Sequence, residues 1–166
     1  MTALGVPRFL EQDVFQYFMN WKAVGGAPWS RAFAAPFAVM QAMDDLSVPR
    51  RDPPAYLAAH QLSEAARIIR GAGWHFSWMG GLENMLNKLR SFAHTEQEVQ
   101  KWLDPHALAR AVRRREFFYN GTSLRQVPVD SSFPALIQKQ KLRYEADGLL
   151  APKPGLRDFV RGLYPW

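Results

Sequence analysis

Two indoles, an imidazole, a hydroxyl and a carboxylate lie close together near the middle of this chain of 166 residues, at Trp74, His75, Ser77, Trp78 and Glu83. An indole offers an apolar face on which a sugar ring can stack, and its N–H can bond outward. A neutral imidazole can bind a metal ion, and a carboxylate can act as a general base. This combination of groups is typical of a site that handles sugars.

A short strand, a glycine turn and an amphipathic helix are expected to position these groups. Residues 73–78 have strand character, and the pair Gly80-Gly81 indicates a turn. Beyond the turn, apolar residues recur at helical spacing from Leu82, so one face of this helix belongs to the core. Glu83 falls on the other face, in the first helical turn.

A regular strand would divide the candidate side chains between its two faces. Residues 74, 76 and 78 share one face, whereas His75 and Ser77 share the other. His75 and both tryptophans therefore cannot all face one site. We expect Trp74 to lie in the core, and Trp78, beside the glycine turn, to lie at the site or its rim.

The first third of the chain predicts strands and one short helix. Residues 13–21 are aromatic and β-prone, and the following glycines indicate a turn. From Trp29 we expect a short strand and then a helix that starts near Pro36. Residues 47–54 contain three prolines and three charged residues, which favours a surface loop.

A second helix is predicted by Asp104-Pro105, which supplies an N-cap and a proline in the first helical position. This helix should run to about Tyr119 and stop at Asn120-Gly121. Four arginines, at positions 110 and 113–115, form a basic face that is most simply solvated. A short strand, a short helix and a tail are expected after it.

The stretch from residue 71 to 96 resembles glycosyltransferase family 17, the β-1,4-mannosyl-glycoprotein N-acetylglucosaminyltransferases. The matching positions are Trp74, His75, Ser77, Gly80, Gly81, Glu83, Lys88, Ser91, His94 and Glu96. Weaker similarity covers Tyr17 to Trp21, Trp29, and the residues Val127, Pro128 and Pro134. The resemblance implies one α/β domain over residues 1–166, a partial GT-A-like nucleotide-sugar transferase domain whose mixed sheet is flanked by helices.

The resemblance also implies roles for individual residues. Glu83 would remove the proton of the acceptor hydroxyl in an inverting transfer, although it can equally complement the positive helix N-terminus. His75 would contact a metal ion or the donor diphosphate, or else be a buried histidine with a satisfied hydrogen bond. Trp74, Trp78, Lys88, His94 and Glu96 are the further candidates for substrate binding. Lys88 would pair with phosphate, unless it is a solvated helix residue, and His94 can also complement the helix C-terminus.

One motif of such transferases is missing from the sequence. The family carries an Asp-x-Asp element whose carboxylates hold a divalent cation, manganese or magnesium, against the donor diphosphate. This chain has only Asp44-Asp45, and its glycine pairs do not have the spacing of a phosphate-binding loop. We therefore expect a C-terminal portion that lacks the N-terminal, donor-binding and metal-binding half. That half, or a second copy of the chain, is the expected protein partner.

Composition restricts the setting in which the chain works. With 48% hydrophobic residues the chain can form a core, and its net charge of +6 favours anionic partners. It has no cysteine, so disulfides and thiolate zinc sites are excluded, which favours the cytoplasm. No apolar run approaches the length of a membrane span, and no signal peptide is evident.

Three functions remain open at this point. The first is transfer of a hexose, N-acetylglucosamine favoured, from a nucleotide-sugar donor to a saccharide acceptor. The second is an inactive fragment or partner subunit of such an enzyme. The third is a basic, aromatic-rich module that binds nucleic acid, which would show binding that weakens steeply with salt.

Overall fold

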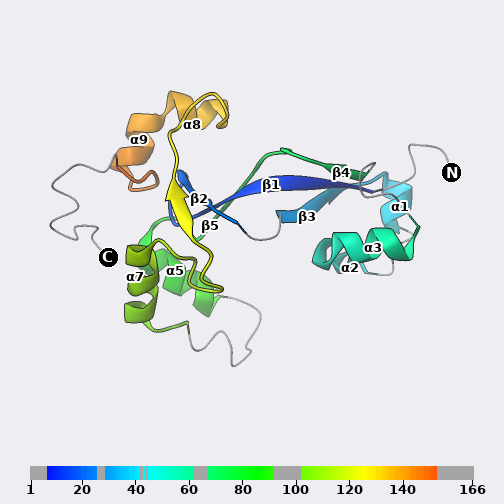
Figure 1. Ribbon diagram of the computed structural model, residues 1–166, viewed down its shortest axis with the longest axis horizontal. Helices are drawn as coiled ribbons and strands as arrows, with labels where there is room; N and C mark the ends of the chain where they lie inside the picture. Colours follow the sequence, from blue (N-terminus) through cyan, green and yellow to red (C-terminus); the bar gives the residue numbers. More distant parts are fainter. Residues whose placement is uncertain are drawn as a thin grey trace. The chain divides into compact units, whose positions relative to one another are not determined.

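The computed structural model describes residues 7–25, 29–41, 43, 45–61, 67–91 and 102–152. These residues form a mixed α/β structure in which a largely antiparallel sheet is accompanied by helices (Figure 1), so the expected α/β class is confirmed. The chain divides into two compact units. The first unit is drawn from Met1–Asp13 and Ala27–His75, and the second from Val14–Gly26 and Phe76–Trp166.

The first unit is built around the beginning of strand β1 (Arg8–Gln16). Strand β3 (Trp29–Ala34) pairs with it antiparallel, and the two-residue strand β4 (Ile68–Ile69) pairs with it parallel. Phe9 is fully buried and packs against the rings of Phe33 and Tyr56. The strand at residue 29 was predicted, whereas the strand predicted at 13–21 begins at Arg8 and ends at Gln16.

Three short helices complete the described part of the first unit. They are α1 (Phe37–Gln41), α2 (Ser47–Arg51) and α3 (Pro53–Ala59). The helix after Pro36 was predicted, but the surface loop predicted at residues 47–54 is wrong. Asp52 caps α3 by accepting a hydrogen bond from the Ala55 amide at 3.0 Å, and the prolines that follow occupy first-turn positions, where a missing N–H costs nothing.

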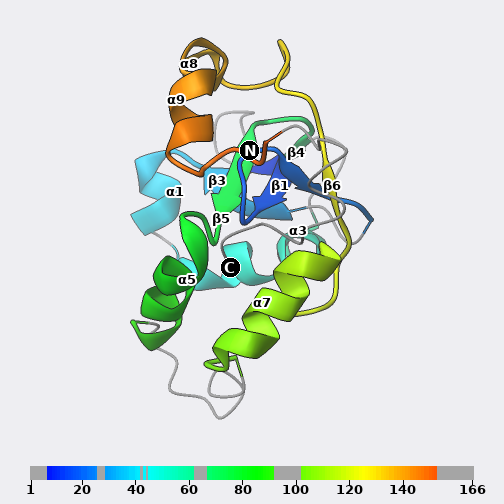
Figure 2. The ribbon, with the colours of Figure 1, turned by 90° about the vertical axis from the view of Figure 1, so that its left-hand side faces the viewer.

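In the second unit the sheet continues through two short strands. Phe15, near the end of β1, pairs with β2 (Trp21–Ala23), which pairs antiparallel with β6 (Leu124–Gln126). Helices α5 (Gly81–Arg90) and α7 (Pro105–Arg114) contact each other, as do α8 (Ala135–Lys139) and α9 (Lys141–Ala146), which lie together in both Figures 1 and 2. None of the helices in the described ranges is long and apolar enough to cross a bilayer.

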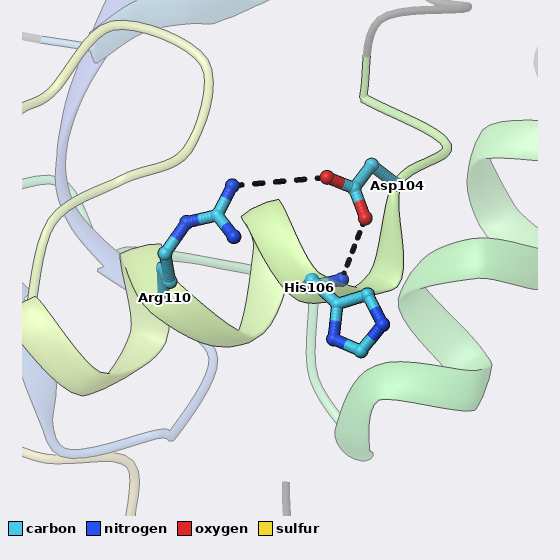
Figure 3. Close-up of polar contacts among 3 residues, drawn as sticks. All are labelled: Asp104, His106 and Arg110. Atoms are coloured by element: carbon cyan, nitrogen blue, oxygen red, sulfur yellow. Dashed lines mark hydrogen bonds and ion pairs between the residues drawn. The ribbon is translucent and has the colours of Figure 1, made fainter.

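Helix α7 starts as predicted and ends earlier than predicted. The Asp104 carboxylate accepts a hydrogen bond from the His106 amide at 2.8 Å and lies 3.7 Å from the Arg110 guanidinium (Figure 3). The expected end at Tyr119 is wrong, because Arg115 adopts a left-handed backbone with φ 55° and closes the helix at Arg114. An arginine is an uncommon residue at such a position, so the sequence did not indicate this end.

Tyr17 lies in the core of the second unit and connects the end of β1 to the segment after α7. Its hydroxyl donates a hydrogen bond to the Glu116 carbonyl at 2.9 Å and accepts one from the Phe118 amide at 2.8 Å. Its ring packs against Trp21 and Phe117. Burial is the main reason that the pKa of Tyr17 lies well above its ordinary value. The two hydrogen bonds satisfy backbone groups that would otherwise lack partners.

We predict that Tyr17→Phe lowers the free energy of unfolding by about 1–3 kcal/mol, because the substitution leaves a buried amide and carbonyl without their partner. Urea denaturation followed by circular dichroism measures this loss. Tyr119→Phe is the matched control, since Tyr119 is exposed. Equal effects of the two substitutions would contradict the assigned role of the Tyr17 hydroxyl.

The same tyrosine predicts a dependence of stability on pH. The native state keeps the Tyr17 proton at pH values where the unfolded chain has lost it, because burial raises the pKa of this group in the folded protein. Its contribution is therefore fully present below the unfolded pKa and is lost as the pH rises above it. Above about pH 10, the ordinary pKa of a tyrosine, wild type should lose more stability with rising pH than Tyr17→Phe does. Parallel losses in the two proteins would be inconsistent with this origin.

Candidate functional site

Trp78 and the two glycines of the turn adopt a backbone that most side chains avoid. Strand β5 (Trp74–Ser77) pairs with β1 and is followed by Trp78 with φ 59°, then by Gly80 and Gly81 with φ 81° and 91°. A Cβ at Gly80 would lie 2.5 Å from the side-chain nitrogen of Asn84, which itself donates to the Gly80 carbonyl at 2.7 Å. The hydrogen bond from Asn84, in the first turn of α5, therefore stabilises the glycine turn, after which the helix begins at Gly81.

Trp74 does not lie in the core, where it was expected, and Trp78 leaves the regular strand. Trp74, expected in the core, has 38% of its surface exposed and is no core residue. Trp78, expected at the site or its rim, is half-buried and packs edge-on against Phe118 at a centroid distance of 4.8 Å. The alternation of a regular strand stops at Ser77, so the face on which residue 78 falls could not be obtained by counting.

Lys88 connects the last turn of α5 to the end of β5. Its ammonium donates a hydrogen bond to the Ser77 hydroxyl at 3.0 Å and lies 4.3 Å from the centre of the Trp78 ring. Burial lowers the pKa of Lys88 below its ordinary value. The ammonium of Lys88 is thus held by two residues of the sequence motif, and one face of the Trp78 ring is covered by a cation. This contact was not predicted, since the alternatives for Lys88 were phosphate binding or solvation.

Glu83 is exposed in the first turn of α5, where a carboxylate complements the positive end of the helix. Among the described residues it has no hydrogen-bond or ion-pair partner, so its carboxylate is open to solvent. Five positions separate it from Lys88, which corresponds to about 140° around the helix axis. The helix therefore does not place these two candidates on one face.

His75 lies in the first unit, beside a cavity that the sequence did not indicate. Its ring stacks on the Trp29 ring at a centroid distance of 4.4 Å and an angle of 30°. The Arg31 guanidinium lies 5.0 Å from the centre of the same indole, and Arg50 donates to the Arg31 carbonyl at 3.3 Å. The cavity measures about 340 Å³, and its lining residues are Gln12, Trp29, Arg31, Ala32, Phe33, Arg50 and His75.

This Trp29–His75 cavity combines aromatic planes with two cations. A stacked indole and imidazole offer a surface for a planar or apolar ring, and guanidinium groups bind oxyanions with fork geometry. Trp29 and Arg31 come from β3, Arg50 from α2 and His75 from β5. No local pattern could have joined them, since Trp29 and His75 are far apart in the sequence and meet because both strands adjoin β1.

Two of the predicted site residues, His94 and Glu96, lie outside the described residues. Within the described ranges, no group of three or more histidine or carboxylate residues could hold a metal ion. His75 by itself is a single ligand, and a divalent cation prefers several oxygen ligands. The described residues thus do not fit the expected cation, and we derive no step through it.

We predict that Gly80→Ala destabilises the protein more than Gly121→Ala does. Both glycines have left-handed backbones, with φ 81° and 71°, where an alanine costs about 1–2 kcal/mol. A Cβ at Gly121 meets nothing within 4 Å, whereas one at Gly80 displaces the Asn84 side chain. That displacement should add about 0.5–1.5 kcal/mol, measured by urea denaturation.

Adding Asn84→Ala to both variants is the control. It removes the crowded atom, so the difference between the two glycine positions should shrink. A difference that persists without the Asn84 side chain would show that this contact does not shape the turn.

The chain was compared with protein-family models, with curated proteins and with solved structures. No family model matches it, and neither a curated protein nor a solved structure does.

Proposed function

We propose that this chain is part of an inverting glycosyltransferase that transfers a hexose, N-acetylglucosamine favoured, from a nucleotide sugar to a saccharide acceptor. The motif of residues 71–96 suggests this activity through its resemblance to glycosyltransferase family 17. The observation that carries the proposal is the Trp29–His75 cavity, because it contains a residue of that motif together with groups suited to a nucleotide diphosphate.

The donor offers three chemically distinct parts: a planar base, a doubly charged diphosphate and a sugar. The stacked rings of Trp29 and His75 provide an aromatic surface for a planar ring. Arg31 and Arg50 line the same cavity and provide positive charge for phosphate oxygens. In the transfer step, the bond between the sugar's anomeric carbon and the diphosphate breaks, and charge that develops on the departing diphosphate is stabilised by such cations.

The acceptor side of the reaction needs a base. In an inverting transfer the acceptor oxygen attacks the anomeric carbon while its proton passes to a carboxylate. The resemblance assigns this role to Glu83, whose carboxylate is exposed at the start of α5. The divalent cation is expected from the Asp-x-Asp residues of a separate half, which would complete the donor site beside the Trp29–His75 cavity and is the proposed partner.

Titration calorimetry of the chain with UDP-N-acetylglucosamine, with and without manganese, tests the proposal. Trp29→Ala and Arg31→Gln should each weaken binding about tenfold or more, because they remove a stacking surface or a cation. His60→Ala and Arg51→Gln are the matched controls and should not change binding. His60 stacks on Tyr56 in the same unit, and Arg51 follows Arg50 in α2, but neither lines the cavity.

Glu83→Gln separates the two proposed roles. It should leave nucleotide-sugar binding unchanged, since the base acts on the acceptor. A chain that unfolds cooperatively, yet binds neither the nucleotide sugar nor a mannose- or N-acetylglucosamine-containing oligosaccharide, would contradict the proposal. Salt-sensitive binding to single-stranded nucleic acid in place of both would favour the nucleic-acid alternative.

A further inference from the structure

A second cavity with cationic side chains lies in the second unit, where β6 and α9 both contribute to its wall. It measures about 350 Å³, and its lining residues are Asn20, Arg115, Arg125, Gln126, Val127, Pro128, Val129, Lys141, Glu145 and Ala151. None of these residues was a candidate for catalysis or substrate binding in the sequence. We refer to it as the Arg125–Lys141 cavity.

Hydrogen bonds hold one wall of this cavity in place. The Asn20 side chain donates to the Ala151 carbonyl at 3.0 Å and accepts from the Ala151 amide at 2.8 Å. Gln126 donates to the carbonyls of Ala151 and Pro152 at 3.0 and 2.8 Å. The segment at Ala151 is thereby fixed against β6. A wall that is already ordered in the free protein loses little entropy when a ligand binds.

The Arg115 side chain is also positioned before any ligand arrives. Its backbone closes α7 in a left-handed conformation, and its carbonyl accepts a hydrogen bond from the Leu124 amide at 2.7 Å. Its guanidinium lies 5.4 Å from the centre of the buried Trp21 ring. Such a contact with an aromatic face restrains a long side chain. Arg115 is half-buried as a result, unlike its exposed neighbour Arg114.

The charges around the cavity are unbalanced. Arg115, Arg125 and Lys141 contribute three positive charges, and Glu145 contributes one negative charge. Within the described part of the chain, none of the three cations has a carboxylate close enough for an ion pair. The residue directly across the ladder from Arg125 is Lys22, so the cross-strand position supplies no counter-charge either. The remaining wall, formed by Val127, Pro128, Val129 and Ala151, is mainly apolar.

We propose that the Arg125–Lys141 cavity binds an oxyanion, a phosphate or a carboxylate, that is carried by a small apolar body. A guanidinium fork can bond two oxygens of such a group at once, and an ammonium adds a point charge. The valine and proline side chains would cover the body of the ligand. Isolated surface cations are usually solvated, but here three of them border one cavity with a preformed wall. This proposal rests on residues other than those of the proposed glycosyltransferase site and does not depend on it.

The test is titration of the whole chain with inorganic phosphate, phenyl phosphate and benzoate, followed by amide chemical shifts in NMR. Shifts should concentrate on the amides of residues 125–127 and 129, and phenyl phosphate should bind more tightly than inorganic phosphate because its ring contacts the apolar wall. Benzyl alcohol, which lacks the charge, should bind far more weakly. Benzoate compared with phenyl phosphate identifies which oxyanion is preferred.

Charge variants test whether the cavity is responsible. Lys141→Gln and Arg125→Gln should each weaken phenyl phosphate binding about tenfold, since each removes a charge-assisted contact. Arg143→Gln is the matched control on α9, because Arg143 is exposed and pairs with Asp147. Glu145→Gln should strengthen binding several-fold, since it removes the carboxylate that lines the cavity.

Glu145→Gln is expected to strengthen binding, whereas the cation variants are expected to weaken it. The proposal therefore stays testable even if one cation variant folds poorly. Circular dichroism and cooperative unfolding establish that each variant is folded. The proposal is overturned if the amides of residues 125–127 and 129 in the folded wild type do not shift with inorganic phosphate, phenyl phosphate or benzoate. It is equally overturned if Arg143→Gln weakens binding as much as Lys141→Gln, since the attraction would then come from net charge alone.

Discussion

The Tyr17 side chain and backbone join three parts of the second unit that are far apart in the sequence. The hydroxyl bridges the backbone of Glu116 and Phe118, and the Tyr17 amide donates to the Ser77 carbonyl at 3.2 Å. The position of Ser77 determines where the Lys88 ammonium finds its partner. Phe118 in turn packs against Trp78. A buried tyrosine is thus linked, directly or through one neighbour, to Ser77, Trp78 and Lys88.

Local signals in the sequence were sufficient to predict several elements that are bordered by a capping residue or a glycine turn. β5, α5 and the start of α7 were predicted because apolar periodicity, a glycine pair and Asp104-Pro105 act over a few residues. The helices at 47–59 were missed because prolines were interpreted as loop residues when they occupy first-turn and buried positions. The end of α7 was missed because Arg115, a bulky residue, adopts a left-handed backbone there.

The candidate sites were less predictable than the fold, for a different physical reason. His75 could be named from its motif, but its stacking partner Trp29 and the cations Arg31 and Arg50 reach it only through strand pairing and helix packing. The same holds for Arg115, Arg125 and Lys141, which come from three separate elements. The net charge of +6 indicated anionic partners, but only the fold shows that part of this charge borders two cavities, one in each unit.

The way in which the chain divides into units limits how the two units can be separated from each other. Each unit contains two separate stretches of sequence, and the boundaries fall after Asp13, after Gly26 and after His75. Strands β1 and β5 each contribute residues to both units. A single genetic exchange, or a single cut by a protease, therefore cannot separate one intact unit from the other.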